Sequence, residues 1–366
     1  MQDGLEVKRE GINARDLLDQ AIEALLPLAS VPLALIVGAG MLWALKVNPL
    51  AAYGALLDGI FGSTFGLTQT LVLATPLLLV ALGISIAFRG GILNIGGEGQ
   101  IIVGALAGTA IALSLPGLPG WLLITVSILA GALAGAVWGG IPGVLRARFG
   151  VNEILSTIMM NQIAVQLNLY LLTGPMLDPK EAAAGSSIAQ SAQIPRSSWL
   201  PILVPQTLLN AGLILAVVLA VLVYIFLWRT TTGYRIRAVG LNTDASRYAG
   251  IRVPFFQALS LSLSGAFAGI AGAALVLGVQ HRMLEGLSGG YGFTGIVVAL
   301  FGQLHPLGAI PAAVIFGGLL VGTAQMQRTV QVPSAIVNAF LGLIVLFVVS
   351  SEIWARRRAR RRQTHV

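Results

Sequence analysis

Long apolar segments recur along almost the whole chain, from Pro27 to Ser350, and each is long enough to cross a membrane. The hydrocarbon core of a bilayer is about 30 Å thick, which a helix of roughly 20 apolar residues spans. Hydrophobic residues make up 56% of the 366 positions and charged residues 10%, whereas a soluble domain carries about 25% charge. A membrane β-barrel would instead show short alternating segments. The sequence therefore predicts an all-α polytopic membrane protein.

The apolar segments divide the chain into about ten predicted spans, with a margin of one or two. They cover residues 28–46, 66–88, 100–115, 121–145, 154–173, 203–227, 255–278, 292–304, 307–325 and 334–351. The span 292–304 is too short for an ordinary crossing, so we expect a half-helix or a re-entrant segment there. The predicted organisation is a cytoplasmic amphipathic segment at 1–27, a membrane domain at 28–351 and a basic tail at 352–366.

The distribution of positive charge predicts the orientation. With the N-terminus inside and alternating spans, 17 of the 22 Lys and Arg residues fall on the inside, and the five others are Lys46, Lys180, Arg196, Arg282 and Arg328. By the positive-inside rule, both termini are predicted to be cytoplasmic. Six arginines between Arg356 and Arg362 follow the last span directly. They are expected to anchor the topology and to be able to contact anionic membrane lipid, and this clustering argues against nucleic-acid binding.

Several kinds of chemistry have no residues to support them. The chain has no cysteine, and its three histidines (His281, His305 and His365) have no metal-ligand spacing. We therefore predict no catalytic residues and no metal site. A phosphate-loop motif is also missing, so ATP-driven work would require a separate ATPase chain. Residues 1–26 lack the pattern of a signal peptide, so the first apolar segment is expected to remain as an anchor.

A polar, glycine-rich run interrupts the apolar sequence between Arg89 and Gln100. It contains Asn94, Glu98 and Gln100, and an acid inside a membrane costs roughly 3 kcal/mol. Glycine is a poor helix former, and broken backbone at membrane depth is tolerated only inside protein or beside a water-filled path. The run therefore indicates a transport protein with an interrupted element near the solute route.

The sequence around this run recurs in the second half of the chain. Residues 96–108 and 290–302 share six of thirteen positions at a shift of 194, although chance similarity among small apolar residues is an alternative. Span 66–88 is predicted to run opposite to span 255–278, and span 154–173 opposite to span 334–351. Inverted repeats with broken helices are typical of transporters, with the solute path at the repeat interface.

Two polar connections are candidate contact surfaces. In the cytoplasmic segment 229–252, Asn242 or Thr243 suits a helix N-cap, Asp244 the first turn and Gly250 the end. The expected helix of about seven residues, ~10 Å long, is too short to be stable alone. It is either a docking element for a partner or an ordinary solvated loop. The outside loop at 174–200 is likewise either a contact for a soluble partner or a passive loop.

Four segments resemble one transporter family. Ile92–Gln100 resembles its F-N-I-G-A-E-G-Q signature, with Leu93 in place of the aromatic residue and Gly97 in place of alanine. Val151–Asn161 is similar to its N-E-V-I-S-T-L-M-L-N segment. Gly233–Ile251 and Gly290–Leu300 resemble its cytoplasmic loop and its G-Y-G-F-x-G-I-A-V-A-L run. The family comprises the permease subunits of bacterial ABC importers for nucleosides, simple sugars and branched-chain amino acids, and the nucleoside branch is the most similar.

The resemblance implies a type II ABC importer fold in a bacterial plasma membrane. It implies a second, related permease, a cytoplasmic ATPase that binds ATP and Mg, and an extracellular substrate-binding lipoprotein. No cofactor is expected on this chain. The implied ATPase-coupling residues are Asn242, Thr243, Asp244, Ala245, Ser246, Arg247, Tyr248, Ala249 and Gly250. The implied translocation-path candidates are Asn94, Glu98, Gln100, Asn152, Glu153, Asn161, Tyr291, Phe293 and Thr294.

Structural roles are the alternatives for these path candidates. Glu98 is equally suited to capping a helix, Glu153 to an ion pair with Arg146 or Arg148, and Asn161 to joining helices. Tyr291 and Phe293 are suited to core packing as well as to stacking on a base. The predicted function is import of nucleosides, and simple sugars or branched-chain amino acids are alternative substrates. An ion-coupled secondary transporter and an export or lipid-translocating permease are the rival functions.

Overall fold

The computed structural model describes residues 33, 36–44, 46–185, 188–331, 339, 342, 343 and 346. The chain divides into two compact units, Met1–Pro49 with Ser334–Val366 and Leu50–Pro333. In the first unit, residues 36–44 are helical. The predicted segment 1–27, most of the predicted span 334–351 and the tail 352–366 lie outside the described residues, as does part of the span 28–46.

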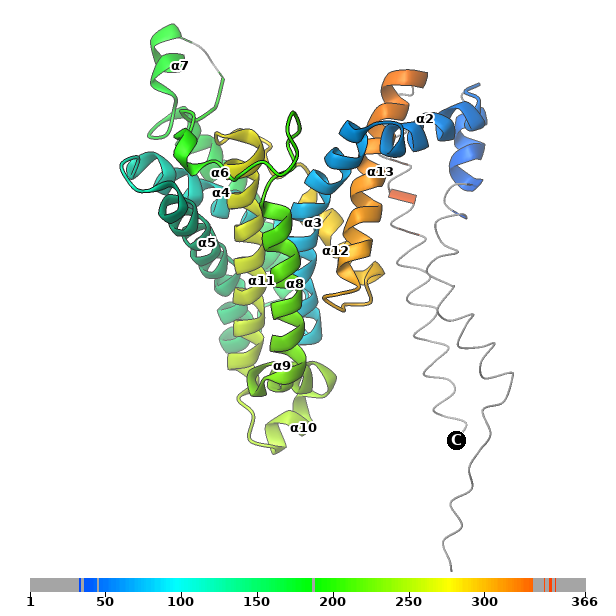
Figure 1. Cartoon of the computed structure of the whole chain (residues 1–366). Helices are drawn as coiled ribbons and strands as arrows, with labels where there is room; N and C mark the ends of the chain where they lie inside the picture. Colours follow the sequence, from blue (N-terminus) through cyan, green and yellow to red (C-terminus); the bar gives the residue numbers. More distant parts are fainter. Residues whose placement is uncertain are drawn as a thin grey trace, which may run out of the picture. The chain divides into compact units, whose positions relative to one another are not determined.

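The second unit is built from helices (Figure 1). Seven helices of the described chain are long and apolar enough to cross a membrane. They are α3 (Thr64–Arg89), α4 (Gly97–Ser114), α5 (Gly120–Phe149), α6 (Glu153–Thr173), α8 (Gly212–Arg229), α11 (Val253–Leu275, extended by π-helical turns at Val276–Gln280) and α13 (Ala309–Val330). Among the described residues, β-structure is limited to three isolated bridges. The predicted all-α polytopic membrane protein is confirmed.

Most predicted spans coincide with helices, and the differences have local causes. The span predicted at 203–227 begins as a helix only at Gly212. Asn210 fixes the turn before it, because its Oδ1 accepts from the Gly212 N–H (2.9 Å) and its Nδ2 donates to the Gly278 carbonyl (3.0 Å). The short segment predicted at 292–304 is the short helix α12 (Tyr291–Phe301). A further short helix, α2 (Pro49–Phe61), was not predicted.

Helix α3 lies at the centre of the packing in this unit. In the most apolar stretch of α3, 83% of the residues are buried, whereas in the corresponding stretches of α5 and α6 only 22% are buried. It packs against α8, α11, α12 and α13. Outward-facing apolar residues such as Leu133 on α5, which is 67% exposed, are suited to lipid or to another membrane subunit.

Helices α5 and α11 meet along glycines spaced four residues apart. A side chain at Gly135 would overlap the carbonyl oxygen of Gly265, and a side chain at Gly265 would overlap that of Gly135. A side chain at Gly269 would likewise overlap the carbonyl oxygen of Gly131. Lipid tails are as apolar as leucine, so membrane helices associate mainly through such close backbone packing. These glycines therefore set the distance between α5 and α11.

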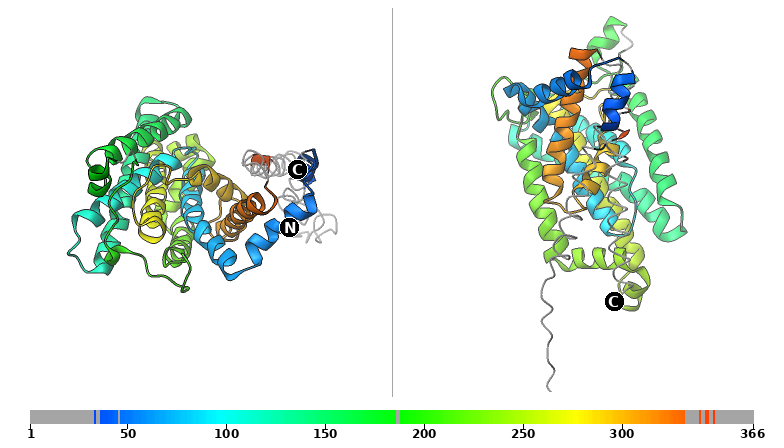
Figure 2. Two further views of the ribbon diagram at one scale, coloured as in Figure 1. Left: turned by 90° about the horizontal axis from the view of Figure 1, so that it is seen from above. Right: turned by 90° about the vertical axis from the view of Figure 1, so that its right-hand side faces the viewer.

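The two ends of the second unit carry different short elements. At one end, which we call the α10 end, α9 (Thr231–Leu241) lies across the long helices and leads into α10 (Thr243–Tyr248) (Figures 1 and 2). At the opposite end, the α7 end, lie α7 (Pro179–Ala184) and the 3₁₀ turn η1 (Arg196–Ser198). Bridges Leu177–Ser191 and Gln190–Leu284 order the predicted outside loop and fasten it to the segment after α11.

Candidate functional site in the broken elements and at the α10 end

The segment between α3 and α4 is irregular because its polar side chains bond to the chain itself. The Asn94 Oδ1 accepts from the Gly96 N–H (2.9 Å), and its Nδ2 donates to the Gln100 Oε1 (2.9 Å) and to the Ser264 Oγ (2.8 Å). Asn94, Gln100 and Ser264 are all buried. Buried amides need such partners, so these bonds fix the break between the two helices and tie it to α11.

Asn161 joins α6 to the same break. Its Oδ1 accepts from the Gly99 N–H (2.8 Å), and its Nδ2 donates to the Ile95 carbonyl (2.9 Å). Both ends of the amide are therefore used inside the subunit. This geometry is that of a residue that holds helices together.

Glu98 lies where the N-termini of α4 and α12 meet. Its Oε1 accepts from the Gly292 N–H at 2.7 Å and from the Phe293 N–H at 3.4 Å, and the side chain is 8% exposed. A side chain at Gly292 would overlap the backbone of Glu98. The carboxylate thus caps α12, and its negative charge is favourable beside the positive ends of two helix dipoles.

The position of this contact agrees with the repeat seen in the sequence. Glu98 and Gly292 are 194 residues apart, which is the shift that aligns residues 96–108 with 290–302. A residue touches its own counterpart only near the axis that relates the two copies. The contact therefore supports an inverted pair whose halves meet at the starts of α4 and α12.

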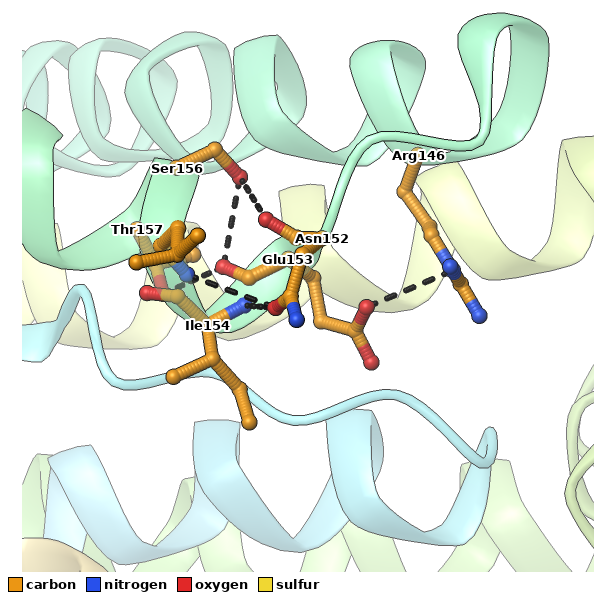
Figure 3. Close-up of polar contacts among 7 residues, drawn as sticks. Arg146, Asn152, Glu153, Ile154, Ser156 and Thr157 are labelled. Atoms are coloured by element: carbon orange, nitrogen blue, oxygen red, sulfur yellow. Dashed lines mark hydrogen bonds and ion pairs between the residues drawn. The ribbon is translucent and has the colours of Figure 1, made fainter.

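Asn152 and Glu153 form a separate group at the start of α6 (Figure 3). The Asn152 Oδ1 accepts from the Ile154 N–H (2.9 Å) and so caps α6. The Glu153 carboxylate lies 3.3 Å from the Arg146 guanidinium, at the end of α5. This pair bridges the turn between α5 and α6, which is the local role that the sequence offered as an alternative.

The three path candidates on α12 are less enclosed than the amide network. Tyr291 and Thr294 are half-buried, and Phe293 is 52% exposed. The predicted set therefore divides in three. Asn94, Glu98, Gln100 and Asn161 form bonds around the break, Asn152 and Glu153 lie at the turn before α6, and Tyr291, Phe293 and Thr294 lie in the first turns of α12.

The predicted coupling segment contains a capped helix. The Asn242 Oδ1 accepts from the N–H groups of Asp244 and Ala245, both at 3.0 Å, and this residue rather than Thr243 is the N-cap. The helix has six residues, one turn plus a short extension, and Gly250 ends the segment in the left-handed conformation (φ 76°). Tyr248 is 94% exposed, whereas Ser246 on the inner side is buried.

Sequence reasoning missed a cluster beside this segment. The Arg89 Nε donates to the Leu304 carbonyl (2.6 Å), and the Arg89 guanidinium lies 4.7 Å from the centre of the Trp228 ring. Arg237 of α9 contacts the same ring at 5.4 Å and donates from Nε to the Leu227 carbonyl (2.9 Å). In the sequence, these arginines contributed only to the charge count, and nothing in their spacing indicated a shared tryptophan.

Helix α9 also contacts the break directly. A methyl group at Gly240 would overlap the carbonyl oxygen of Arg89, and the Gly91 backbone, with φ of 72°, lies against Gly240. The last turn of α9 therefore touches the start of the segment that carries Asn94. Movement of α9 cannot leave this segment unchanged, because the two backbones have no space between them.

Comparison with known proteins identifies the family to which this chain belongs. Residues 66–349 match the family described as branched-chain amino acid transport system / permease component. The chain belongs to this family. It is 37% identical to the guanosine ABC transporter permease NupP of Bacillus subtilis (strain 168) over 328 residues, which cover 89% of this chain and 93% of that protein.

Other relatives of the permease carry different names. A glucose ABC transporter permease of Haloferax volcanii is 37% identical over 91% of this chain and 88% of its own length. A nucleoside ABC transporter permease of Lactococcus lactis is 33% identical over 89% of this chain and 90% of its own length. The permease is thus a multi-pass membrane subunit of an ABC transporter, a transport component rather than an enzyme. Its family implies an ATPase partner and a substrate-binding protein.

Proposed function

We propose that the permease imports nucleosides across a bacterial plasma membrane, with both termini in the cytoplasm. A second, related permease would complete the channel, a cytoplasmic ATPase carrying ATP and Mg would drive it, and an extracellular lipoprotein would deliver the solute. The observation that carries the importer proposal is the capped, exposed helix α10 in a chain that belongs to an ABC permease family.

Nucleosides are proposed as the solute because relatives named for guanosine and for nucleosides align over about nine tenths of this chain. Simple sugars are the second candidate, since the relative named for glucose is as similar as the one named for guanosine. The two solutes share a neutral framework that carries several hydroxyl groups. Branched-chain amino acids are a third candidate, because the family description names them.

The coupling mechanism follows from the contacts of α9. When the ATPase moves α10, α9 moves with it, and Gly240 transmits the displacement to Arg89–Gly91. The Arg89–Trp228–Arg237 cluster links the same movement to the loop between α12 and α13 through the Leu304 carbonyl. Because Asn94, Gln100 and Asn161 bond the irregular segment between α3 and α4 to its neighbours, this segment then moves together with α4 and α6.

The exposed face of α10 provides the test of coupling. We expect Tyr248→Glu or Arg247→Glu to leave the permease in the membrane and the ATPase active, while ATP-driven uptake falls by about tenfold or more. Tyr248→Phe, which keeps the ring, is the matched control and should transport normally. Measuring uptake and ATP hydrolysis in the same proteoliposomes separates the two activities. Wild-type uptake by Tyr248→Glu would contradict the docking role.

The solute and the energy source need separate measurements. The permease is purified in mild detergent with its co-purifying chains, reconstituted, and supplied with labelled guanosine, adenosine or glucose. Saturable, ATP-dependent guanosine uptake that glucose does not inhibit supports the nucleoside proposal, and the reverse supports sugars. Uptake that persists without ATP and disappears with an ion gradient would replace the importer with a secondary transporter.

A further inference from the structure

A groove that none of the roles above uses opens between α2, α3 and α13, towards the α7 end of the second unit. Its volume is about 270 Å³, close to the lower end of the ~300–1,000 Å³ typical of small-molecule pockets. It lies far along α3 from the α10 end, because α3 begins at Thr64 beside α2 and ends at Arg89 beside α9.

The lining of the groove is arranged in tiers along α3 and α13. Residues three or four apart lie on one face of a helix and differ by about 5–6 Å in height. Phe65 on α3 and Arg328 on α13 are exposed and mark the mouth; half-buried Gln69 and Gln325 lie one turn further in, and half-buried Leu73 and Val321 lie one turn beyond them. A charged and aromatic mouth is thus followed by two amides and then by an apolar floor.

Ser63 in the lining caps α3, but four other polar side chains of the groove are unpaired within the part of the chain that the structure describes. No hydrogen bond or ion pair joins the side chains of Asp58, Gln69, Gln325 or Arg328 to another described residue. The buried amides of Asn94, Gln100 and Asn161 differ in this respect, since each has partners inside the subunit. A polar side chain on a membrane helix is costly without a partner, so the groove amides require water or a hydrogen-bonding solute.

We propose that this groove is the permease's share of the outer mouth of the transport path, and that Gln69 and Gln325 form hydrogen bonds with a neutral, hydroxyl-bearing solute. The inference rests on the proposed import function and adds a position and two contacts to it. Each amide both donates and accepts hydrogen bonds, as hydroxyl groups and nucleobases require. Leu73 and Val321 close the inner end as an apolar gate, which excludes water until the subunit moves.

A protein occupant fits the lining less well than a solute does. An apolar face of a second permease, placed on the groove, would leave two amides and two charges without partners. Opposite charges at the mouth, on Asp58 and Arg328, give no net preference for an ion of either sign. The groove is therefore matched to a solute of zero net charge, and its two amides suit one that carries hydroxyl groups.

The absence of cysteine from the chain allows a direct test of access. Gln69→Cys and Gln325→Cys are made singly in the full chain and assembled with its partner subunits. A membrane-impermeant thiol reagent, which needs a hydrated thiolate, is then added from outside. We expect both variants to be labelled, and guanosine or glucose delivered with the receptor to slow labelling. Leu133→Cys, on an outward apolar face of α5, is the control and should stay unlabelled.

Uptake is measured with variants that keep the side-chain size but remove the hydrogen bonds. We expect Gln69→Leu and Gln325→Leu to lower uptake by about tenfold, while the subunit composition of the purified complex stays that of the wild type. Gln162→Leu, at an exposed position of α6, is the matched control and should transport normally.

The outcomes separate this inference from the proposed function. Unreactive thiols at both positions would show that the second permease or the chain's own terminal segments fill the groove, and would overturn the inference while import stands. Labelling that no transported solute slows would overturn the two solute contacts. If the wild-type complex imports neither nucleosides nor sugars, the proposed function fails whatever the thiols show.

Discussion

At the scale of the residue, Glu98 shows how an acid is accommodated inside a membrane protein. Its carboxylate occupies the N-terminus of α12, where two backbone N–H groups have no partner within their own helix. The charge is therefore bound to the protein itself, at the contact between the two repeat copies. A direct role in binding solute would require these bonds to open.

This arrangement predicts different effects for two substitutions. Glu98→Ala leaves the Gly292 N–H without an acceptor and is expected to cost about 1–3 kcal/mol of stability. Glu98→Gln keeps an acceptor oxygen and should retain most of the stability. Thermal denaturation in detergent, followed by size-exclusion chromatography, measures both. Equal stability of Glu98→Ala and the wild type would show that the Glu98 hydrogen bonds do not stabilise α12.

His281 gives a second prediction at this scale. Its ring stacks on Trp199, with centroids 3.7 Å apart, and its buried Nδ1 has no hydrogen-bond partner among the described residues. Arg196 lies over the other aromatic ring of the stack, 5.8 Å from the centre of Trp199. Burial lowers the pKa of His281 below its usual value of about 6.5.

The sign of the pH effect follows from this lowered pKa. The unfolded segment takes up a proton before the folded one, so the stack contributes its full stability above about pH 6.5 and loses it as the pH falls through the lowered pKa. After correction for the slower intrinsic exchange at lower pH, the hydrogen-exchange protection of residues 188–200 is expected to fall as the pH drops below about 6.5. In His281→Phe, which keeps the stack, this pH dependence should disappear. An unchanged dependence in His281→Phe would assign it to another group.

At the scale of the element, the proposed coupling depends on how α9 is held between α8, α10 and α11. Helix α9 packs against α3, α8 and α11, and its hydrophobic residues Ile236 and Val239 share a cluster with Val253 and Phe256. A helix held this way moves with its neighbours. The close contact of Gly240 with the end of α3 makes it the point where that movement reaches the break.

Gly240→Ala tests this point of contact. The added methyl group would overlap the Arg89 carbonyl, so α9 and the break must separate. We expect the variant to hydrolyse ATP but to couple it to uptake about tenfold less efficiently. Gly54→Ala on helix α2, where the added methyl group would meet open space, is the control for an alanine outside the contact. Normal coupling in Gly240→Ala would exclude this route.

At the scale of the whole molecule, the glycine contacts between α5 and α11 hold the second unit together. These helices also contact α4, where a side chain at Gly104 would overlap Gly269. Three helices thus share one close-packed seam. Bonds such as that from Asn94 to Ser264 depend on this spacing, because they join the break to α11.

The seam predicts a severe effect of one larger side chain. Gly265→Leu must push α5 and α11 apart, and overpacking of this kind costs about 1–3 kcal/mol or more. We expect the yield of folded, monodisperse permease to fall strongly. Gly54→Leu, at a helical position with open space around it, is the matched control. Similar yields for the two variants would show that folding does not depend on the close glycine contacts between α5 and α11.

Much of the fold was predictable from local sequence. The span boundaries of α3, α4, α5 and α6 follow from apolar length, and the shortness of α12 follows from the polar residues around it. The Asn242 cap and the Gly250 end were also readable, since capping depends on the backbone within a few residues. Helices α2 and α9 were not predicted. Helix α2, with 13 residues, is shorter than a membrane span. Helix α9 has few apolar residues and is stabilised by packing on its neighbours.

By itself, the sequence determined which segments lie in the membrane and where the chain must break, because hydropathy and backbone preference act over one element at a time. Only the tertiary structure decided the partners: Gly292 for Glu98, Ile95 for Asn161, and a shared Trp228 for Arg89 and Arg237. It also decided which polar residues have no partner within the described chain, among them Gln69 and Gln325. A side chain's partner depends on which distant helices pack beside it, and helix packing is a property of the assembled unit rather than of any one segment.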